Sequence, residues 1–97
     1  MSMTGGAQGT RPVAAVFEFG PEFIENYDRS LELAGGRLRD QPGRRHHVCF
    51  ETDTGYMVVD VWESLEAFER FGEVLNEIVS ELPGPVHVKL HRVHNVI

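Results

Sequence analysis

Two polar residues lie within stretches that are otherwise typical of β-strands, and their types suit acid–base chemistry. His47 belongs to the run 46–52, and Asp60 belongs to the apolar run 56–62. A carboxylate holds a neighbouring imidazole in one tautomer and favours proton uptake by it. Asp60 would be costly to bury without such a partner. We therefore predict either that His47 is a general base oriented by Asp60, or that the two form a hydrogen-bonded pair with a structural role.

Five further residues are candidates for contact with a substrate. The indole of Trp62 can form a wall for an aromatic ligand, or it can pack in the core or in a dimer interface. Tyr56 is expected at the rim of the site, and Cys49 is expected to be a small half-apolar side chain rather than a nucleophile. Glu18 either faces the pocket or lies exposed at an edge. His94, near the C-terminus, either reaches the site or contributes to a dimer interface.

The composition excludes several other classes of function. A strand places His87 and His91 about 13 Å apart and tends to turn His94 to the opposite face, so we expect no bound metal. The net charge of −6 disfavours nucleic acid, which is bound through lysine and arginine. No apolar stretch approaches the roughly 20 residues that span a bilayer, and the N-terminus lacks the order of a signal peptide. We expect a cytoplasmic protein with no membrane partner.

One segment is basic although the protein is acidic. Residues 36–45 contain four arginines and only one acidic residue, and they include Pro42-Gly43, so the segment is predicted to be a loop. It is either a solvated connection whose arginines pair with acidic helix faces or a basic lip that attracts an anionic ligand. The four residues are Arg37, Arg39, Arg44 and Arg45.

The candidate residues must be positioned by a regular order of elements. Residues 1–12 form a predicted flexible tail, and residues 13–97 form one domain. Apolar periodicity together with glycine and proline signals predicts strands over 13–19, 46–52, 56–62 and 86–91, and helices over 21–34 and 64–82. Ser64 is the predicted N-cap of the second helix. Strand, helix, hairpin, helix and strand is the order of the α+β ferredoxin-like fold, in which two helices cover one face of a four-stranded antiparallel sheet.

The hairpin fixes which side chains share a face. Met57, Val59 and Val61 are uniformly apolar and are predicted to meet the helices, because alternate residues of a strand point to opposite faces. His47, Cys49, Tyr56, Asp60 and Trp62 are then predicted on the open face. A two-residue turn at 54–55 would place His47 opposite Trp62, and a three-residue turn would place His46 there. A face of this composition suits a cavity, so we expect a second copy of the chain to close a barrel over it.

The segment from Gly55 to Ser64, followed by Glu66-Ala67-Phe68, resembles the dimeric α/β-barrel proteins of the antibiotic-biosynthesis-monooxygenase superfamily. The matching feature is the junction of strand, Trp62, Glu63, Ser64 and helix. The resemblance extends over 13–97, and the ending Val93-His94-Asn95 is similar to small actinobacterial members. It implies a homodimer and a small-molecule ligand, in a superfamily that includes cofactor-independent monooxygenases acting on aromatic polyketides, haem-degrading enzymes, cyclases and dismutases.

The departures from the superfamily narrow the chemistry. The quinone-forming monooxygenases carry an asparagine where this chain has Val58, and the haem-degrading branch carries a histidine in the helix that follows the tryptophan, where 64–82 has none. The leading hypothesis is an enzyme without a bound cofactor that abstracts a proton from an aromatic or polyketide-like substrate, leading to oxygenation, cyclisation or isomerisation. The alternative is a non-catalytic dimeric ligand-binding or stress-response protein.

Overall fold

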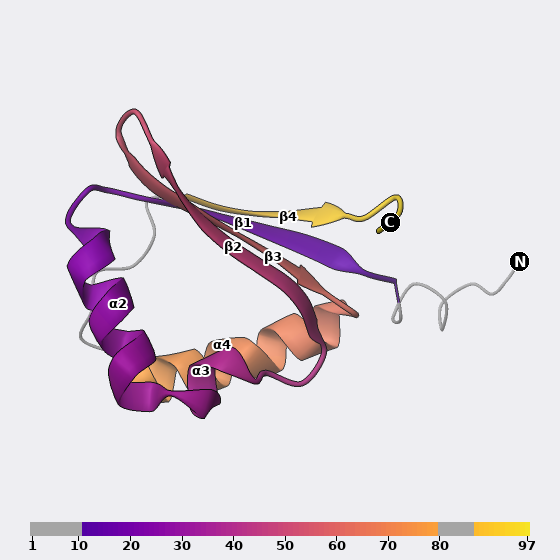
Figure 1. Cartoon of the computed structure of the whole chain (residues 1–97). Helices are drawn as coiled ribbons and strands as arrows, with labels where there is room; N and C mark the ends of the chain where they lie inside the picture. The colour runs from indigo at the N-terminus through magenta and orange to yellow at the C-terminus, as the bar shows by residue number, and fades with distance from the viewer. Residues whose placement is uncertain (1–10, 80–86) are drawn as a thin grey trace, which may run out of the picture.

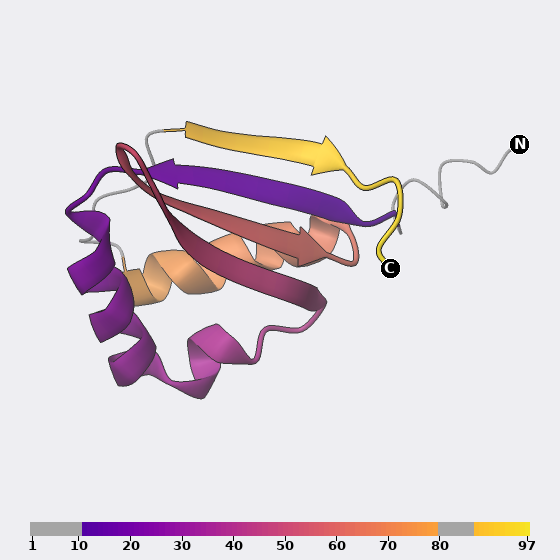
Figure 2. The same cartoon turned by 45° about the horizontal axis from the view of Figure 1, so that its top comes forward.

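Four antiparallel strands form one sheet in the order β2-β3-β1-β4, and the helices lie on one side of it (Figure 1). The structure is a computed structural model that describes residues 11–79 and 87–97. Its elements are β1 (Val13–Phe19), α2 (Phe23–Ala34), α3 (Gly36–Arg39), β2 (Arg44–Thr52), β3 (Gly55–Trp62), α4 (Leu65–Val79) and β4 (His87–Arg92). The predicted ferredoxin-like fold is confirmed, and Figure 2 shows β2 and β4 as the two edge strands.

Local hydrogen bonds explain where α4 begins and where α2 ends. The Ser64 hydroxyl accepts a hydrogen bond from the Ala67 backbone N–H at 3.1 Å, which confirms Ser64 as the N-cap of α4. Helix α2 ends at Gly35, whose φ of 52° lies in the left-handed region and whose N–H donates to the Leu31 carbonyl at 2.9 Å. The predicted end of the second helix, at residues 80–82, lies outside the described residues.

The predicted loop at 36–45 is partly helical. Residues Gly36–Arg39 form the short helix α3, which buries Leu38 against the core. Arg44 is already in β2, and its Nη2 donates hydrogen bonds to the carbonyls of Leu38 at 2.6 Å and of Arg39 at 2.9 Å. A cation is favourable where helix carbonyls lack intrahelical partners. Arg44 thus joins the end of α3 to the start of β2, a role that neither hypothesis for the basic segment included.

The hairpin between β2 and β3 has a different register from both predicted alternatives. Thr52 pairs with Gly55 across Asp53 and Thr54, so His47 lies directly opposite Asp60 and Cys49 opposite Val58. Gly55 is the first residue of β3, and the position requires glycine because a Cβ there would stand 2.2 Å from the Phe19 carbonyl oxygen. A bulge at the other end of β2 makes Arg45 an extra residue, which puts Arg44 opposite Trp62.

The prediction of which β3 face meets the helices was wrong. Val58, Asp60 and Trp62 are the buried residues of this alternation, and Trp62 packs in the core with Ala15, Leu38, Ala67 and Phe71. Met57, Val59 and Val61 lie on the open side. The physical reason is size: a tryptophan ring removes far more apolar surface from water than a valine does, and only the helix side provides enough contacts to bury it.

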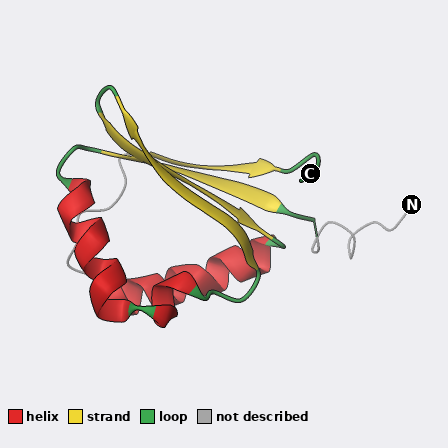
Figure 3. Cartoon of the chain, in the orientation of Figure 1, coloured by secondary structure: helices red, strands yellow, loops and turns green. Residues whose placement is uncertain are grey.

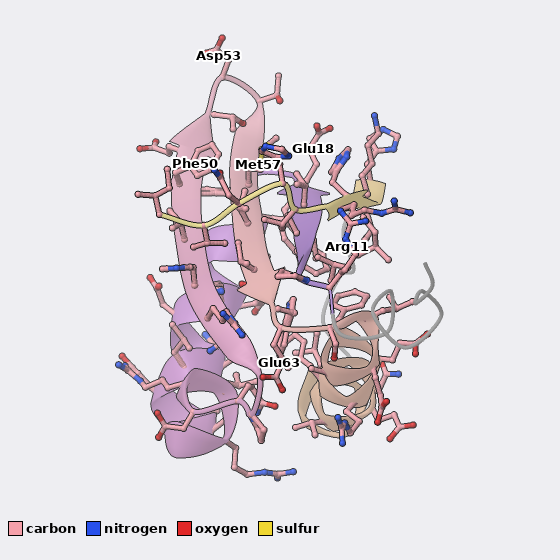
Figure 4. All side chains as sticks on the ribbon, turned by 90° about the vertical axis from the view of Figure 1, so that its right-hand side faces the viewer. Arg11, Glu18, Phe50, Asp53, Met57 and Glu63 are labelled. Atoms are coloured by element: carbon pink, nitrogen blue, oxygen red, sulfur yellow. The ribbon has the colours of Figure 1, made fainter. Side chains whose placement is uncertain are left out.

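The open side of the sheet consequently carries an apolar surface. Val48 pairs with Val59 and Phe50 pairs with Met57, so each pair shares this face, and Val48 and Phe50 are 53% and 42% exposed. Figure 4 shows Phe50 and Met57 side by side on neighbouring strands, and Figure 3 shows helices only on the other side. No helix in the described ranges is both long and apolar enough to cross a membrane.

Candidate functional site

The buried carboxylate of Asp60 is held by His47. Asp60 is 1% exposed and lies on β3, and the Nδ1 atom of His47 on β2 is 2.5 Å from its Oδ1 atom. The two residues are direct cross-strand partners, which brings their side chains together on the helix-facing side. The His47 side chain keeps 29% of its surface exposed, so one end of the pair is buried and the other is open to solvent. The predicted pairing of His47 with Asp60 is present, although on the opposite face of the sheet from the one predicted.

A third residue, Tyr27, completes a row of hydrogen-bonded groups. Its hydroxyl lies 2.7 Å from the Nε2 atom of His47, and the two rings are nearly parallel, at 6° with centroids 6.0 Å apart. Tyr27 comes from α2, on the face that Phe23 and Leu31 share with it at helical spacing. Three separate elements, α2, β2 and β3, therefore contribute one polar group each to the row Tyr27, His47 and Asp60.

Burial controls the ionisation of the groups at the Tyr27 end of this row. Burial raises the pKa of Tyr27 to about 12, and the negative charges of the Cys49 thiolate, which forms only at high pH, and of Asp60 act in the same direction. Burial also raises the pKa of the Cys49 thiol, while the nearby Tyr27 hydroxyl, a donor to the thiolate form, opposes that increase. At neutral pH the Tyr27 hydroxyl is therefore protonated, and Cys49 is a thiol rather than a thiolate. The arrangement is unlike that of a reactive cysteine.

Trp62 is packed from several sides. It is 0% exposed, its ring centroid is 4.9 Å from that of Phe71, and it meets Phe68 edge-on at 6.2 Å. The guanidinium carbon of Arg44 lies 5.7 Å from the Trp62 ring centroid, a cation–π distance. The Nε1 atom of the Trp62 indole is buried and has no hydrogen-bond partner among the described residues. Of the two hypotheses for Trp62, these contacts favour packing in the core.

Aromatic rings connect the two ends of the helix-facing side. Successive ring contacts, with centroids 3.7 to 6.3 Å apart, lead from His47 back to Trp62, which is two residues from Asp60 on β3. The rings in order are those of His47, Tyr27, Phe23, Phe19, Phe17, Phe68 and Trp62. We call this set the aromatic row. Flat apolar surfaces of this kind suit the planar rings of an aromatic ligand.

The remaining predicted site residues are divided between the two faces. Cys49 is half-buried on the same face as His47, and Tyr56 is half-buried there with its ring 6.3 Å from that of Phe23. Glu18 pairs with Met57 and lies on the open side, so it is not on the face of the sheet that carries the His47–Asp60 pair (Figure 4). The alternation of β1 explains this, since Ala15 opposite Asp60 is three residues away from Glu18. His94 is exposed beyond the end of β4.

Glu18 instead lines a hollow of about 250 Å³ on the open side. The other lining residues are Val16, Met57, His87 and Lys89. This hollow is on the opposite side of the sheet from His47 and Asp60, so the two cannot form one site within a single chain. In the described part of the chain, no group of three histidine, cysteine or carboxylate side chains is arranged to hold a metal ion.

Two residues of the site were missed from the sequence. Tyr27 lies within the predicted helix 21–34, where its helical spacing with Phe23 and Leu31 indicates an apolar face; its hydroxyl group on that face was the available signal. Arg44 was assigned to a loop, and the signal for its role was only its position two residues before the predicted strand 46–52. No sequence pattern indicated that its guanidinium would cover an indole ring.

Solved structures with the same fold come from several bacteria. MupZ from Pseudomonas fluorescens aligns with a TM-score of 0.67 and 17% identity, covering 87% of this chain and 74% of that one. A candidate antibiotic-biosynthesis monooxygenase from Caulobacter crescentus aligns with a TM-score of 0.56 and 19% identity over 91% and 92% of the two chains. The chain has the fold of the antibiotic-biosynthesis monooxygenases.

A variant of SnoaB from Streptomyces nogalater, described as a cofactor-independent oxygenase, has this monooxygenase fold as well. It aligns with a TM-score of 0.52 and 17% identity over 89% of this chain and 94% of SnoaB. Neither the models of known protein families nor the curated proteins give a match to the sequence. The resemblance to the antibiotic-biosynthesis monooxygenases thus extends to the fold, and the chemistry has to be argued from the residues of this chain.

Proposed function

We propose that the protein is a small-molecule enzyme that abstracts a proton from an activated aromatic or polyketide-like substrate without a bound cofactor. The observation that carries the proposal is the hydrogen bond of 2.5 Å between His47 Nδ1 and the buried carboxylate of Asp60. In this role His47 takes up the proton and Asp60 stabilises the resulting imidazolium, as a buried carboxylate does for a histidine base. The substrate anion then reacts by oxygenation, cyclisation or isomerisation.

The surroundings of the pair support an aromatic substrate. The aromatic row offers flat apolar rings beside a polar pair, and the Trp62 N–H is a buried donor without a partner in the described chain. A buried donor of this kind is stabilised by about 1–3 kcal/mol when an acceptor reaches it. A carbonyl oxygen of a polyketide-like ring is such an acceptor. In this proposal Trp62 and Tyr56 contact the substrate, with Cys49 beside Tyr27.

We further propose that the protein works as a homodimer in the cytoplasm. The open side of the sheet exposes Val48 and Phe50 beside half-buried Met57, Val59 and Val61. A second copy seated on this surface would remove it from water and would also cover the hollow near Glu18. In such a dimer the contact surface and the proposed catalytic pair lie on opposite sides of the sheet. His94, exposed beyond β4, would belong to the contact surface rather than to the catalytic pair.

A second candidate function is ligand binding without catalysis. The specific observation in its favour is that Trp62 is fully buried and its ring is surrounded by Phe68, Phe71 and Arg44. A wall that is already packed within the core offers less room for a substrate beside the His47–Asp60 pair. In that case the pair stabilises the sheet, and the protein sequesters a ligand.

Replacing His47 by alanine tests catalysis directly. Anthrone is a suitable probe because it is a flat tricyclic ketone with an acidic methylene group. We expect the wild-type protein to accelerate its conversion, measured by absorbance, and His47→Ala to lose this acceleration by on the order of 100-fold or more. The matched control is His46→Ala, the neighbouring histidine, which pairs with Val61 on the open side.

Two results would contradict the proposed catalysis. One is equal conversion by His47→Ala and wild type. The other is binding of anthrone, seen as quenching of the single tryptophan's fluorescence, without any conversion by either protein. The second result would favour the ligand-binding alternative.

A further inference from the structure

The nitrogen of His47 that a substrate would need is already occupied. Nδ1 is bound to Asp60 at 2.5 Å, and Nε2 is bound to the Tyr27 hydroxyl at 2.7 Å. A neutral imidazole has one N–H and one lone pair, so with both nitrogens engaged it has no free site for a substrate proton. A ligand that approaches Nε2 of His47 therefore meets the Tyr27 hydroxyl first.

The direction of the two hydrogen bonds follows from the chemistry of their partners. A carboxylate is an acceptor only, so Nδ1 carries the hydrogen and donates it to Asp60. Nε2 then holds the lone pair and accepts from the Tyr27 O–H. Because the pKa of Tyr27 is about 12, its hydroxyl keeps its proton at neutral pH and acts as the donor. The resting order is thus Tyr27 O–H to His47 Nε2, and His47 Nδ1–H to Asp60.

We propose that Tyr27 is a further catalytic residue that passes the substrate's proton to His47. This inference rests on the proposed function. In the step, the substrate C–H or O–H bond breaks and its proton binds the Tyr27 oxygen, while the original Tyr27 proton moves to Nε2 of His47. The electron pair of the broken bond stays on the substrate as an enolate-type anion. The imidazolium formed remains paired with the Asp60 carboxylate, so charge and atoms balance, and the reverse transfer restores the resting state.

The position of Tyr27 suits contact with a flat substrate. None of the residues of α2 is fully buried, so the side chains that this helix turns towards the sheet keep some access from outside. The Tyr27 ring lies 5.1 Å from that of Phe23, which in turn stacks on Phe19 at 3.7 Å. The oxygen of a phenol can accept a proton from the substrate while it donates its own proton to His47. A residue that only held His47 in position would not need both abilities. The substrate class is therefore a planar ring system with an activated methylene or hydroxyl group.

A different role for Tyr27 makes the opposite prediction. If its hydroxyl merely covers Nε2, then removing the hydroxyl exposes the base and proton abstraction becomes faster. If Tyr27 passes the proton, removing the hydroxyl interrupts the path and abstraction becomes slower. The sign of the change separates the two roles.

The experiment measures proton abstraction without any later step. Full-length protein is mixed with anthrone in deuterated buffer under nitrogen, and the exchange of the methylene protons is followed by proton NMR. We expect Tyr27→Phe to lower the catalysed exchange rate by on the order of 100-fold, with anthrone binding unchanged in titrations of the tryptophan fluorescence. The matched control is Ser30→Ala, which removes a hydroxyl from the next turn of α2 and should leave the rate unchanged. If Tyr27→Phe fails to fold, Tyr27→Leu takes its place, because leucine favours helix.

Each outcome decides between the hypotheses. A rate in Tyr27→Phe equal to or above that of wild type, together with loss of exchange in His47→Ala, overturns the role of Tyr27 and leaves the proposed function standing. Equal losses in Tyr27→Phe and Ser30→Ala also overturn it, since they would point to a general disturbance of α2. No catalysed exchange by the wild-type protein overturns the proposed function and the inference together.

Discussion

The two faces of the sheet differ in opposite ways from a simple protein surface and core: one face buries a charged side chain, and the other exposes apolar side chains. On the helix side, Asp60 is 1% exposed and a charged group is buried, whereas on the open side Phe50 is 42% exposed and apolar groups meet solvent. A folded chain tolerates the first arrangement when the charge has a hydrogen-bond partner, and here His47 provides it. It tolerates the second when another surface covers the apolar groups. The first requirement is met within the chain, and the proposed second copy would meet the other.

The largest expected effect is on the stability of the helix side. Trp62→Ala removes a ring with no exposed surface and should lower the free energy of unfolding by about 3–5 kcal/mol. The matched change on the open side is Phe50→Ala, for which we expect about 1 kcal/mol in the monomer because much of that ring is already in water. Urea unfolding followed by circular dichroism at low protein concentration measures both. Similar losses for the two variants would mean that the faces do not differ in this way.

The next effect concerns the open side and the second copy. Phe50→Glu places a charge on the proposed contact surface and should weaken dimerisation by on the order of 10- to 100-fold in Kd, while the monomer stays folded. The matched control is Leu33→Glu, since Leu33 is an exposed residue of α2, 82% accessible and outside that surface. Sedimentation equilibrium measures the Kd. If the wild-type protein stayed monomeric at millimolar concentration, this would contradict the proposal that a second copy covers the open side of the sheet.

The smallest effect is the pH dependence of the helix side. Because the folded pKa of Tyr27 is about 12, the unfolded chain loses this proton first as the pH rises above about 10. The stability due to Tyr27 is therefore complete below pH 10 and decreases between pH 10 and 12. Partial exposure of the ring limits the loss to roughly 1 kcal/mol. Urea unfolding of wild type and Tyr27→Phe at pH 9 and 11 measures it, and a difference between the two proteins that does not shrink at pH 11 would contradict the assignment.

Most of the fold was predictable because its signals are local. Gly35 ended the first helix, Ser64 began the second, and the order of apolar runs gave the sheet and its two covering helices. The His47–Asp60 pairing was also anticipated, since a carboxylate within an apolar strand requires a partner. These predictions depend on short stretches of sequence and on the general cost of burying polar groups.

The orientation of the sheet was not predictable in the same way. Met57, Val59 and Val61 form the more uniformly apolar set of β3, but the competing set contains Trp62, whose burial outweighs theirs. A hydrophobic pattern in the sequence gives each apolar residue the same weight. The free energy of burial depends instead on the apolar surface area of the side chain and on the groups that pack against that side chain. The contact between Tyr27 and His47 joins residues 20 positions apart through the tilt of α2, which no spacing in the sequence encodes.

The bulge in β2 has a consequence for how chains of this kind can vary in length. Arg45 is the one residue that the ladder skips, because Arg44 pairs with Trp62 and His46 with Val61. A chain without Arg45 would form a regular ladder with the same partners, and Arg44 and His47 would keep their places on the helix side. A gain or loss of one residue at this point would therefore leave the Arg44–Trp62 and His47–Asp60 pairs intact. The gain or loss of one residue is therefore best tolerated at this end of β2. At the hairpin end, the same gain or loss would shift the pairing with β3 by one residue and turn every side chain of β2 to the other face.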